Sequence, residues 1–303
     1  MTSRAAATRA EPDEVDNADE QLLVQRLADL DTRLRSYGSV LVAFSGGADS
    51  AMLLAAARGS LGAEHVVAAT AWSPSLPAAE RAAAADFCAS LGVRQVTPAT
   101  HELERAGYRA NAGDRCGFCK SELLDTLGPV AGELGLHVVA TGTNADDAVA
   151  GFRPGIAAAA ARGAVTPLRD AGLTKAQVRA ASRRWGLTTW DKPAAACLSS
   201  RIAYGVQVSR ERLERVERAE TGLRGALVAA GIAVRDLRIR DLGDHARVEV
   251  DAAAVGAVSR SAQVRAAVRA AGFETVDVDE RGFRSGAMNE LLPDPDRWRW
   301  PPG

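Results

Sequence analysis

The stretch Ser39–Ser50, SVLVAFSGGADS, places an apolar run directly before a glycine turn and an Ala/Leu-rich segment. Residues 39–44 have the composition of a short strand buried in a parallel sheet. Residues 51–58 are expected to form the helix that follows. Gly46 and Gly47 allow a tight turn whose N–H groups approach an anion closely, and the helix N-terminus adds partial positive charge. The stretch therefore predicts a phosphate-binding loop between a strand and a helix.

The segments around this loop extend the same alternation of helix and strand. An amphipathic helix is expected over 21–37, because its leucines recur at helical spacing. Further strands and helices are predicted in turn along the chain: strands at 65–70, 94–96 and 137–143, and helices at 77–91, 120–134 and 174–185. Strands that alternate with helices indicate an α/β fold with a parallel sheet.

The pattern changes near Gly205. A long charged helix is expected over 209–231. It is followed by the strand-like segments VRDLRIRDLG, ARVEVD and ETVDVD, with a helix near 260–271 before the last of them. This order predicts a smaller α+β domain. The expected division is a disordered tail at 1–20, an α/β domain at 21–205, a C-terminal domain at 206–292 and an irregular tail at 293–303.

Composition excludes several classes of protein. The 303 residues carry a formal net charge of −1, which argues against a protein that mainly coats nucleic acid or an anionic membrane. No apolar run reaches the roughly 18–20 residues that span a bilayer, and no secretory signal is visible. We therefore expect a cytoplasmic protein, in which the four cysteines stay reduced rather than forming disulfides.

The SGGADS loop differs from the common nucleotide-binding patterns, since it lacks both the Gly-Lys-Ser/Thr ending and the dinucleotide fingerprint. The loop resembles the pyrophosphate loop (PP-loop) of the N-type ATP pyrophosphatase superfamily, whose members adenylate an acceptor. The resemblance implies that the loop holds ATP with Mg²⁺ through Ser45, Gly46, Gly47, Asp49 and Ser50. The segment 142–147, GTNADD, is also similar to that superfamily and implies nucleotide-site roles for Gly142, Asp146 and Asp147. A solvated acidic loop is the alternative for the two aspartates.

The cysteines divide into two groups. Cys88 lies in a helical Ala-rich segment and is expected to be a buried core residue. Cys116 and Cys119 form a C-x₂-C pair, a spacing that lets both sulfurs bind one metal or cluster. Cys197 lies further along in a polar context. An incidental or redox-active pair remains the alternative for Cys116 and Cys119.

Four further segments narrow the resemblance to one family. They are 144–155 (NADDAVAGFRPG), 190–205 (WDKPAAACLSSRIAYG), 218–227 (RAETGLRGAL) and 282–289 (GFRSGAMN). Together with the loop they are similar to LarE, the ATP-dependent sulfur transferase that makes the nickel-pincer cofactor of lactate racemase. The resemblance covers roughly residues 21–292. It implies adenylation of the carboxylates of pyridinium-3,5-biscarboxylic acid mononucleotide and their conversion to thiocarboxylates.

The LarE family has two variants, which differ in where the sulfur comes from. In one, the cysteine at the position of Cys197 gives up its own sulfur. In the other, three cysteines hold a [4Fe–4S] cluster that carries the sulfide. Because this chain has Cys116, Cys119 and Cys197, it resembles the cluster variant, with a sacrificial Cys197 as the alternative. The source of the sulfide stays open.

The resemblance also implies roles for charged residues. Cys197, Arg201, Lys120 and Asp49 are expected to be catalytic, with Arg201 also contacting the substrate, because arginine binds phosphate and carboxylate groups through two parallel hydrogen bonds. Arg238, Arg240 and Arg284 are expected to hold the substrate phosphate, Arg153 to lie near the nucleotide, and Glu220 to help bind a divalent metal. The family also implies a homo-oligomer.

Three other functions remain to be weighed against this one. A tRNA thiolase would use the same ATP loop, but the chain shows no recognisable RNA-binding module. An ammonia-using synthetase would leave the three cysteines without a role. A zinc-stabilised ATP-binding module would leave the adenylating loop unexplained.

Overall fold

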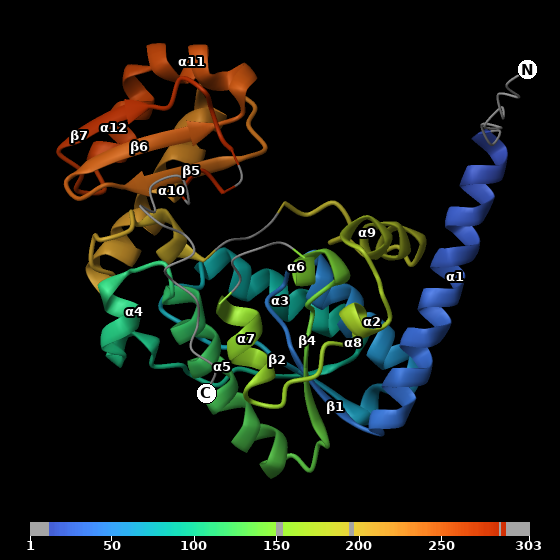
Figure 1. The fold of residues 1–303 in the computed structure, drawn as a ribbon. Helices are drawn as coiled ribbons and strands as arrows, with labels where there is room; N and C mark the ends of the chain where they lie inside the picture. Colours follow the sequence, from blue (N-terminus) through green and yellow to red (C-terminus); the bar gives the residue numbers. More distant parts are fainter. Residues whose placement is uncertain (1–11, 150–153, 194–196, 285, 289–303) are drawn as a thin grey trace, which may run out of the picture.

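The computed structural model describes residues 12–149, 154–193, 197–284 and 286–288 of the 303-residue chain. Two sheets organise these residues. The first is four-stranded and parallel with strand order β3-β2-β1-β4, and the second is three-stranded with order β5-β6-β7. Figure 1 shows them in two parts of the molecule, each with its own helices. The predicted α/β fold with a smaller α+β C-terminal domain is confirmed.

The parallel sheet is built around β1, the strand that the sequence places before the glycine turn. Val40 of β1 is in register with Val66 of β2 on one side and with Val138 of β4 on the other. The strands are β1 (Val40–Ala43), β2 (Val66–Ala69), β3 (Arg94–Val96) and β4 (Val138–Thr141). Because all four run parallel, the loops that follow β1, β2 and β4 meet at one edge of the sheet.

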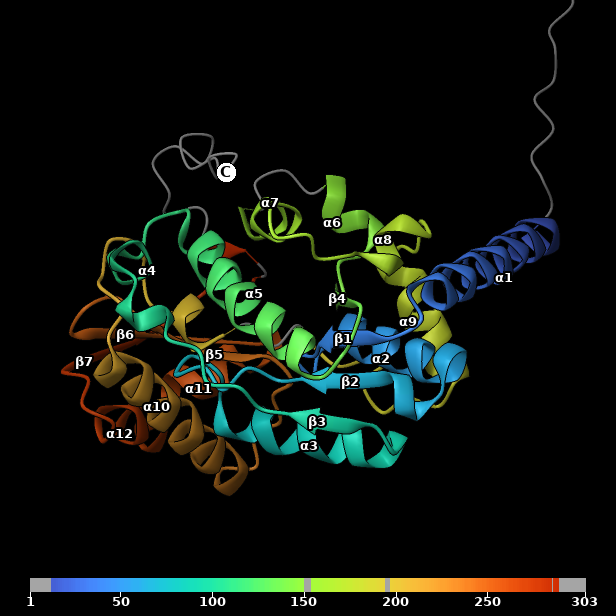
Figure 2. The same cartoon turned by 90° about the horizontal axis from the view of Figure 1, so that it is seen from below.

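Alternating side chains of β1 pack on the two faces of the sheet. Val40 and Val42 join a core with α1, α2, α3 and α9, whereas Leu41 packs against α5 on the opposite face. Figure 2 shows α5 and α3 on opposite sides of the strands. The bounds are α1 (Pro12–Tyr37), α2 (Ala48–Leu61), α3 (Ala78–Leu91), α5 (Arg115–Glu133) and α9 (Lys175–Arg184).

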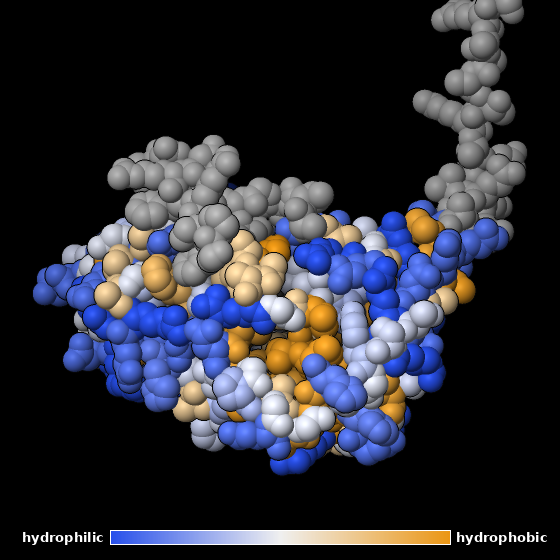
Figure 3. All heavy atoms as spheres, turned by 60° about the horizontal axis from the view of Figure 1, so that its bottom comes forward, coloured by the Kyte–Doolittle hydropathy of each residue, from blue (hydrophilic) through white to orange (hydrophobic). Residues whose placement is uncertain are grey.

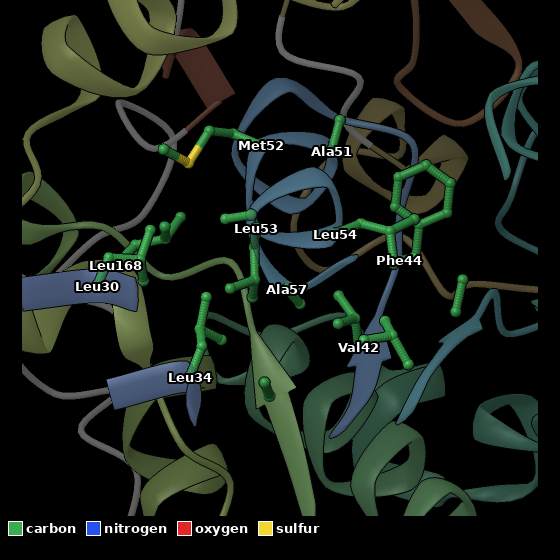
Figure 4. Close-up of a cluster of buried hydrophobic side chains, with 14 of the residues drawn as sticks. Leu30, Leu34, Val42, Phe44, Ala51, Met52, Leu53, Leu54, Ala57 and Leu168 are labelled. Carbon is green, nitrogen blue, oxygen red and sulfur yellow. The ribbon is translucent and has the colours of Figure 1, made fainter. Parts of the chain in front are cut away.

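Helix α2 is the centre of the larger core. Its residues Met52, Leu53 and Leu54 are buried on several sides of the helix, which therefore lies between the sheet and α1 rather than at the surface. Figure 4 shows these side chains together with Leu30 and Leu34 of α1. A helix that is apolar all round needs such enclosure.

Helix α1 begins earlier than the sequence pattern indicated. The chain is helical from Pro12, so residues 12–20 do not belong to the predicted disordered tail. The added stretch, 12–20, reads PDEVDNADE and is mostly polar. Apolar periodicity alone does not reveal this polar first part of the helix.

Several short helices connect the sheet to the second half of the chain. They are α4 (Ala106–Ala110), α6 (Ala145–Val149), α7 (Pro154–Ala160) and α8 (Pro167–Asp170), with 3₁₀ turns η1 (Ala63–His65), η2 (Glu102–Glu104) and η3 (Leu198–Arg201). The expected helix over 174–185 is confirmed as α9, which Thr174 opens with a capping box to Gln177.

The C-terminal part has a core of its own. Strand β6 pairs antiparallel with β5 and parallel with β7, and α10 and α12 lie against this sheet. Its elements are α10 (Arg210–Ala229), β5 (Leu237–Asp241), β6 (His245–Val250), η4 (Ala252–Ala254), α11 (Val255–Arg260), α12 (Ala262–Arg269) and β7 (Thr275–Val278). Leu198 and Ile202 also join this core, so the segment that follows Cys197 is anchored in the C-terminal part.

The face of the molecule drawn in Figure 3 is mostly hydrophilic, with a group of hydrophobic side chains exposed near its middle. In the part of the chain that the structure describes, no helix combines the length and the apolar character needed to cross a membrane.

We predict that Leu34→Ala lowers the free energy of unfolding by about 2–5 kcal/mol, because it removes a fully buried side chain between α1 and α2. Leu22→Ala, on the same helix but 38% exposed, is the matched control and is expected to cost less than about 0.5 kcal/mol. Urea unfolding followed by circular dichroism measures both. Equal losses for the two variants would contradict the packing of α1 described above.

Candidate active site

The loop after β1 leaves backbone N–H groups available at the start of α2. Gly47 is the N-cap of α2, and this N-cap makes no side-chain hydrogen bond to the first turn. Gly46 has a φ of +73°, a conformation that favours glycine. The loop is braced from inside, because Ser50 Oγ donates to the Gly47 carbonyl at 3.1 Å and lies 3.2 Å from Ser45 Oγ. This is the geometry that helix N-termini use to bind anions.

Strand β4 brings a second glycine against this loop. A Cβ atom added to Gly142 would lie 2.8 Å from the backbone nitrogen of Ser50 and 2.9 Å from its Cα. The chain after β4 therefore touches the first turn of α2 at a distance that only glycine permits. The structure thus places Gly142 against the first turn of α2, and Ser45, Gly47 and Ser50 line the same cavity as Gly142.

The acidic residues near the loop separate into two roles. Asp49 and Asp147 line the same cavity, and the charge of Asp147 contributes to raising the pKa of Asp49, although burial is the larger cause. Asn144 is buried and accepts a hydrogen bond from the Asp147 backbone at 3.1 Å. Asp146 instead accepts a hydrogen bond from the backbone of Lys175 at 2.8 Å, at the start of α9. Of Asp146 and Asp147, only Asp147 lines the cavity beside the loop.

Asp49 has the properties of a ligand for a cation. Its Oδ1 is buried and finds no hydrogen-bond partner among the described residues. Mg²⁺ bound with nucleotide phosphates takes one or two protein carboxylates. Asp49 and Asp147 therefore fit a Mg²⁺ ion carried in with ATP.

A cavity of about 330 Å³ connects the loop to the cysteines. At one end are the residues of the loop and of the turn after β4. At the other end the cavity reaches Glu102, Cys119, Lys120 and Cys197, and its wall between them is formed by the ends of β1 and β2 with Thr70, Ser73, Ser75 and Leu76. The glycine loop and two of the three cysteines, Cys119 and Cys197, thus line one cavity.

Cys116 and Cys119 lie on the first turns of a helix rather than before it. Helix α5 begins at Arg115, five positions earlier than the predicted start at 120, so the two cysteines occupy i and i+3 positions on one side of the helix. The sequence pattern missed this start because the segment before Lys120 is polar. The N-cap, Asp114, makes no side-chain hydrogen bond to the helix. Cys116 is exposed and Cys119 is half-buried.

Cys197 comes close to this pair from a distant part of the sequence. It is the N-cap of η3, and its Sγ lies 2.9 Å from Ser199 Oγ. Burial raises the pKa of the Cys119 thiol, and the nearby Cys197, Glu102 and Cys116 raise it further. Cys88 is apart from them in the core next to Phe87, where burial raises its pKa to about 11. Cys116, Cys119 and Cys197 thus lie near one another, whereas Cys88 lies apart in the core.

The three cysteines do not converge on a single point. Within the described ranges, no group of three or more His, Cys, Asp or Glu side chains is arranged to hold one metal ion. An iron–sulfur cluster makes a different demand, because its thiolate ligands bind different iron atoms. Thiols are the donors that hold such clusters; Cys119 and Cys197 line one end of the cavity, and Cys116 lies one turn before Cys119 on α5.

Lys120 lies at the cysteine end of the cavity. No carboxylate of the described residues pairs with its ammonium group, and burial lowers its pKa. A desolvated lysine without a protein counter-ion suits an anionic ligand such as a phosphate.

Two residues that sequence analysis did not assign also belong to this region. Lys192 donates to the Gly46 carbonyl at 3.0 Å and to Glu80 at 2.6 Å, which ties the segment before Cys197 to the ATP loop. Glu102 is buried and accepts hydrogen bonds from Ser73 and Ser75 at the cavity wall. Lys192 lies in the segment 190–205 that carries the family resemblance, whereas nothing in the local sequence marks Glu102.

Three of the predicted substrate arginines, Arg201, Arg238 and Arg240, are buried. Arg201 bonds Glu220 at 2.9 Å, and Arg240 bonds Glu249 at 2.6 Å. Arg238 lies 5.1 Å from the centre of the Phe283 ring, and burial lowers its pKa. The ion pair with Arg201 gives Glu220 a structural partner, so its metal role stays a prediction.

A second, larger groove of about 1090 Å³ lies between α3 and α10. It brings together Arg201, Glu220 and Arg238 from the predicted set, with Lys192 and Glu80 at its border. Arg240 and the half-buried Arg284 do not line it. Arg153 lies outside the described residues.

Comparison with known proteins gives consistent relatives. No protein-family model matches the chain. An uncharacterized protein of Synechocystis is 37% identical over 89% of this chain and 99% of its own length. The pyridinium-3,5-bisthiocarboxylic acid mononucleotide synthase of Lactiplantibacillus plantarum is 31% identical over 89% of this chain and 96% of its own length. An uncharacterized protein of Methanocaldococcus jannaschii is 24% identical over 58% of this chain.

The similarity to the Lactiplantibacillus synthase spans both parts of the fold, and the resemblance seen in the sequence motifs points to the same proteins. The chain belongs to the LarE family of pyridinium-3,5-bisthiocarboxylic acid mononucleotide synthases.

Proposed function

We propose that this chain is an ATP-dependent sulfur transferase that converts the carboxylates of pyridinium-3,5-biscarboxylic acid mononucleotide to thiocarboxylates. The observation that carries the proposal is the single cavity lined by the ATP loop, Lys120, Cys119 and Cys197. An adenylated carboxylate formed at one end is within the same enclosure as the sulfur at the other. Adenylation and sulfur transfer then need no release of the reactive intermediate.

The geometry of the loop supports adenylation as the first step. A substrate carboxylate oxygen attacks the α-phosphorus of ATP, and the bond from that phosphorus to the pyrophosphate oxygen breaks. The backbone N–H groups at the start of α2 stabilise the negative charge that develops on pyrophosphate. Asp49 and Asp147 would hold the Mg²⁺ that accompanies the phosphates, and Lys120 would add a positive charge on the cysteine side.

Sulfur transfer takes place at the other end of the cavity. A hydrosulfide sulfur attacks the carbonyl carbon of the acyl-adenylate, the bond from carbon to the AMP oxygen breaks, and the proton passes to water. The products are a thiocarboxylate and AMP. Cys116, Cys119 and Cys197 would hold a [4Fe–4S] cluster, which supplies an iron without a protein ligand as the place where sulfide binds. The surroundings of the three cysteines are consistent with anionic sulfur, since the buried Arg115 lies beside two of them.

The pyridinium mononucleotide is expected to extend from the cavity toward the C-terminal part. Its phosphate is a dianion that arginine recognises through parallel hydrogen bonds. Arg201 and Arg238 line the neighbouring groove, and Leu198 is held to the Ser75 carbonyl at 2.8 Å beside the cavity wall. These contacts favour the groove as the phosphate end of the substrate site.

We predict that Asp49→Asn and Asp147→Asn each lower the rate of substrate-dependent exchange of pyrophosphate into ATP by roughly 10²-fold or more, since each removes a Mg²⁺ ligand. Asp146→Asn is the matched control, because Asp146 bonds α9 and does not line the cavity. Exchange of labelled pyrophosphate measures all three. Equal losses for Asp146→Asn and Asp147→Asn would contradict the assignment.

We predict that anaerobic reconstitution with iron and sulfide loads the wild-type protein, and that Cys116→Ser, Cys119→Ser and Cys197→Ser each lose most of the iron. Cys88→Ala is the control and is expected to keep it, because Cys88 is enclosed in the core away from the cavity. Iron analysis and visible absorption are the readouts. An iron-free wild type that forms thiocarboxylate while Cys197 becomes dehydroalanine would instead support the sacrificial mechanism.

A further inference from the structure

A lysine that the sequence analysis did not assign is bonded to the backbone of the glycine loop. The ammonium group of Lys192 donates to the Gly46 carbonyl at 3.0 Å and to the Glu80 carboxylate at 2.6 Å. Its backbone is held as well, because Arg179 of α9 donates to the Lys192 carbonyl at 2.9 Å. The Lys192 side chain is only 23% exposed, so these bonds are partly shielded from water.

The bond from Lys192 falls on the peptide unit that joins two glycines. Gly46 has a φ of +73°, and a peptide unit flanked by glycines can rotate to the opposite orientation at little steric cost. The Gly46 carbonyl and the Gly47 N–H belong to this planar trans unit and therefore point in opposite directions. An ammonium group held on the carbonyl thus also sets the direction of the N–H.

The two ends of this peptide unit face different sides of the loop. Gly47 lines the cavity of about 330 Å³, whereas Lys192 and Glu80 line the groove beside α3 and not the cavity. A Cβ on Gly46 would lie 3.7 Å from Glu80 Oε2 and 3.8 Å from Lys192 Nζ, so Gly46 faces this outer side. No described residue accepts a hydrogen bond from the Gly47 N–H. This donor is therefore available to an anion in the cavity.

We propose that Lys192 is a positioning residue that holds the 46–47 peptide with its N–H directed into the cavity, where the N–H binds a phosphate group of ATP. The inference rests on the proposed function in that the loop binds ATP, and it needs neither sulfur transfer nor a cluster. The opposite orientation would turn a carbonyl oxygen toward the phosphate oxygens and repel them. A hydrogen bond from an ammonium group is stronger than one between neutral groups, which suits lysine to this role.

Two other roles for Lys192 make different predictions. In the first, its charge attracts the phosphates without orienting the peptide. In the second, its ion pair with Glu80 serves only to stabilise the fold. Two substitutions separate these roles, since Lys192→Gln keeps a donor for the Gly46 carbonyl and loses the charge, whereas Lys192→Met loses both.

The test measures the binding of three probes, pyrophosphate with Mg²⁺, ATP with Mg²⁺, and adenosine, by isothermal titration calorimetry. Lys175→Met is the matched control. Lys175 is an exposed lysine at the start of α9 whose charge acts on Asp49 of the same loop, but its ammonium group bonds no described residue of the loop. Thermal unfolding followed by circular dichroism checks that each variant is folded.

Lys192→Met is expected to weaken the binding of pyrophosphate and of ATP by roughly tenfold or more, because a hydrogen bond to a charged group is lost from the loop. Adenosine is expected to bind as it does to the wild type, since it has no phosphate to contact the Gly47 N–H. Lys192→Gln is expected to lose less than Lys192→Met, and Lys175→Met to lose less than about threefold.

Three results would overturn the proposal. Equal losses for Lys192→Gln and Lys192→Met would assign the effect to charge alone, and equal weakening of adenosine and pyrophosphate would assign it to the fold. Wild-type affinity of Lys192→Met for pyrophosphate would show that Lys192 does not orient the loop.

The outcome is separate from that of the proposed function. A wild type that binds ATP and forms no thiocarboxylate would refute sulfur transfer, yet the comparison of the two variants at position 192 would still decide the role of Lys192. A wild type that binds neither pyrophosphate nor ATP would overturn that role directly, because the loop would then hold no phosphate.

Discussion

The close approach of the β4 turn to the first turn of α2 is the constraint on which the active site depends. Gly142 leaves no room for a Cβ against the Ser50 backbone, so the chain after β4 lies directly on the ATP loop. The parallel pairing of β1 with β4 sets the position of this contact, and α2 is packed between the sheet and α1. Asp49 and Asp147 reach one cavity because these two turns touch.

The sulfur end of the cavity depends on a second long-range connection. The segment around Cys197 is held by polar contacts as well as by the burial of its apolar side chains. Asn111 and Arg115 donate hydrogen bonds to its backbone carbonyls. The backbone N–H of Leu198 donates to the Ser75 carbonyl, and Lys192 of the same segment donates to the Gly46 carbonyl. Leu198 and Ile202 then anchor it in the C-terminal core. The segment is thus tied to the ATP loop, to α5 and to the second domain at once.

Local patterns in the sequence predict the strands, the glycine turn between β1 and α2 and the capped helix α9 closely, because each depends on neighbouring residues. The same patterns miss the start of α5 at Arg115 and the polar first part of α1, where apolar periodicity is weak. They also miss Glu102 and the pairing of Arg201 with Glu220, since these contacts join residues far apart in the chain. Family resemblance identifies the three cysteines, but only the fold shows that Cys119 and Cys197 share a cavity with the loop.

The central claim is that adenylation and sulfur transfer occur in one cavity with sulfur carried, and renewed, at three cysteines. Its most direct test is turnover of the anaerobic enzyme with ATP, the pyridinium mononucleotide and isotope-labelled sulfide, followed by mass spectrometry of the product and of the Cys197 peptide. The account predicts repeated turnover, labelled sulfur in the thiocarboxylate and an intact Cys197. Unlabelled sulfur in the product, with dehydroalanine at position 197 after one turnover, would contradict it.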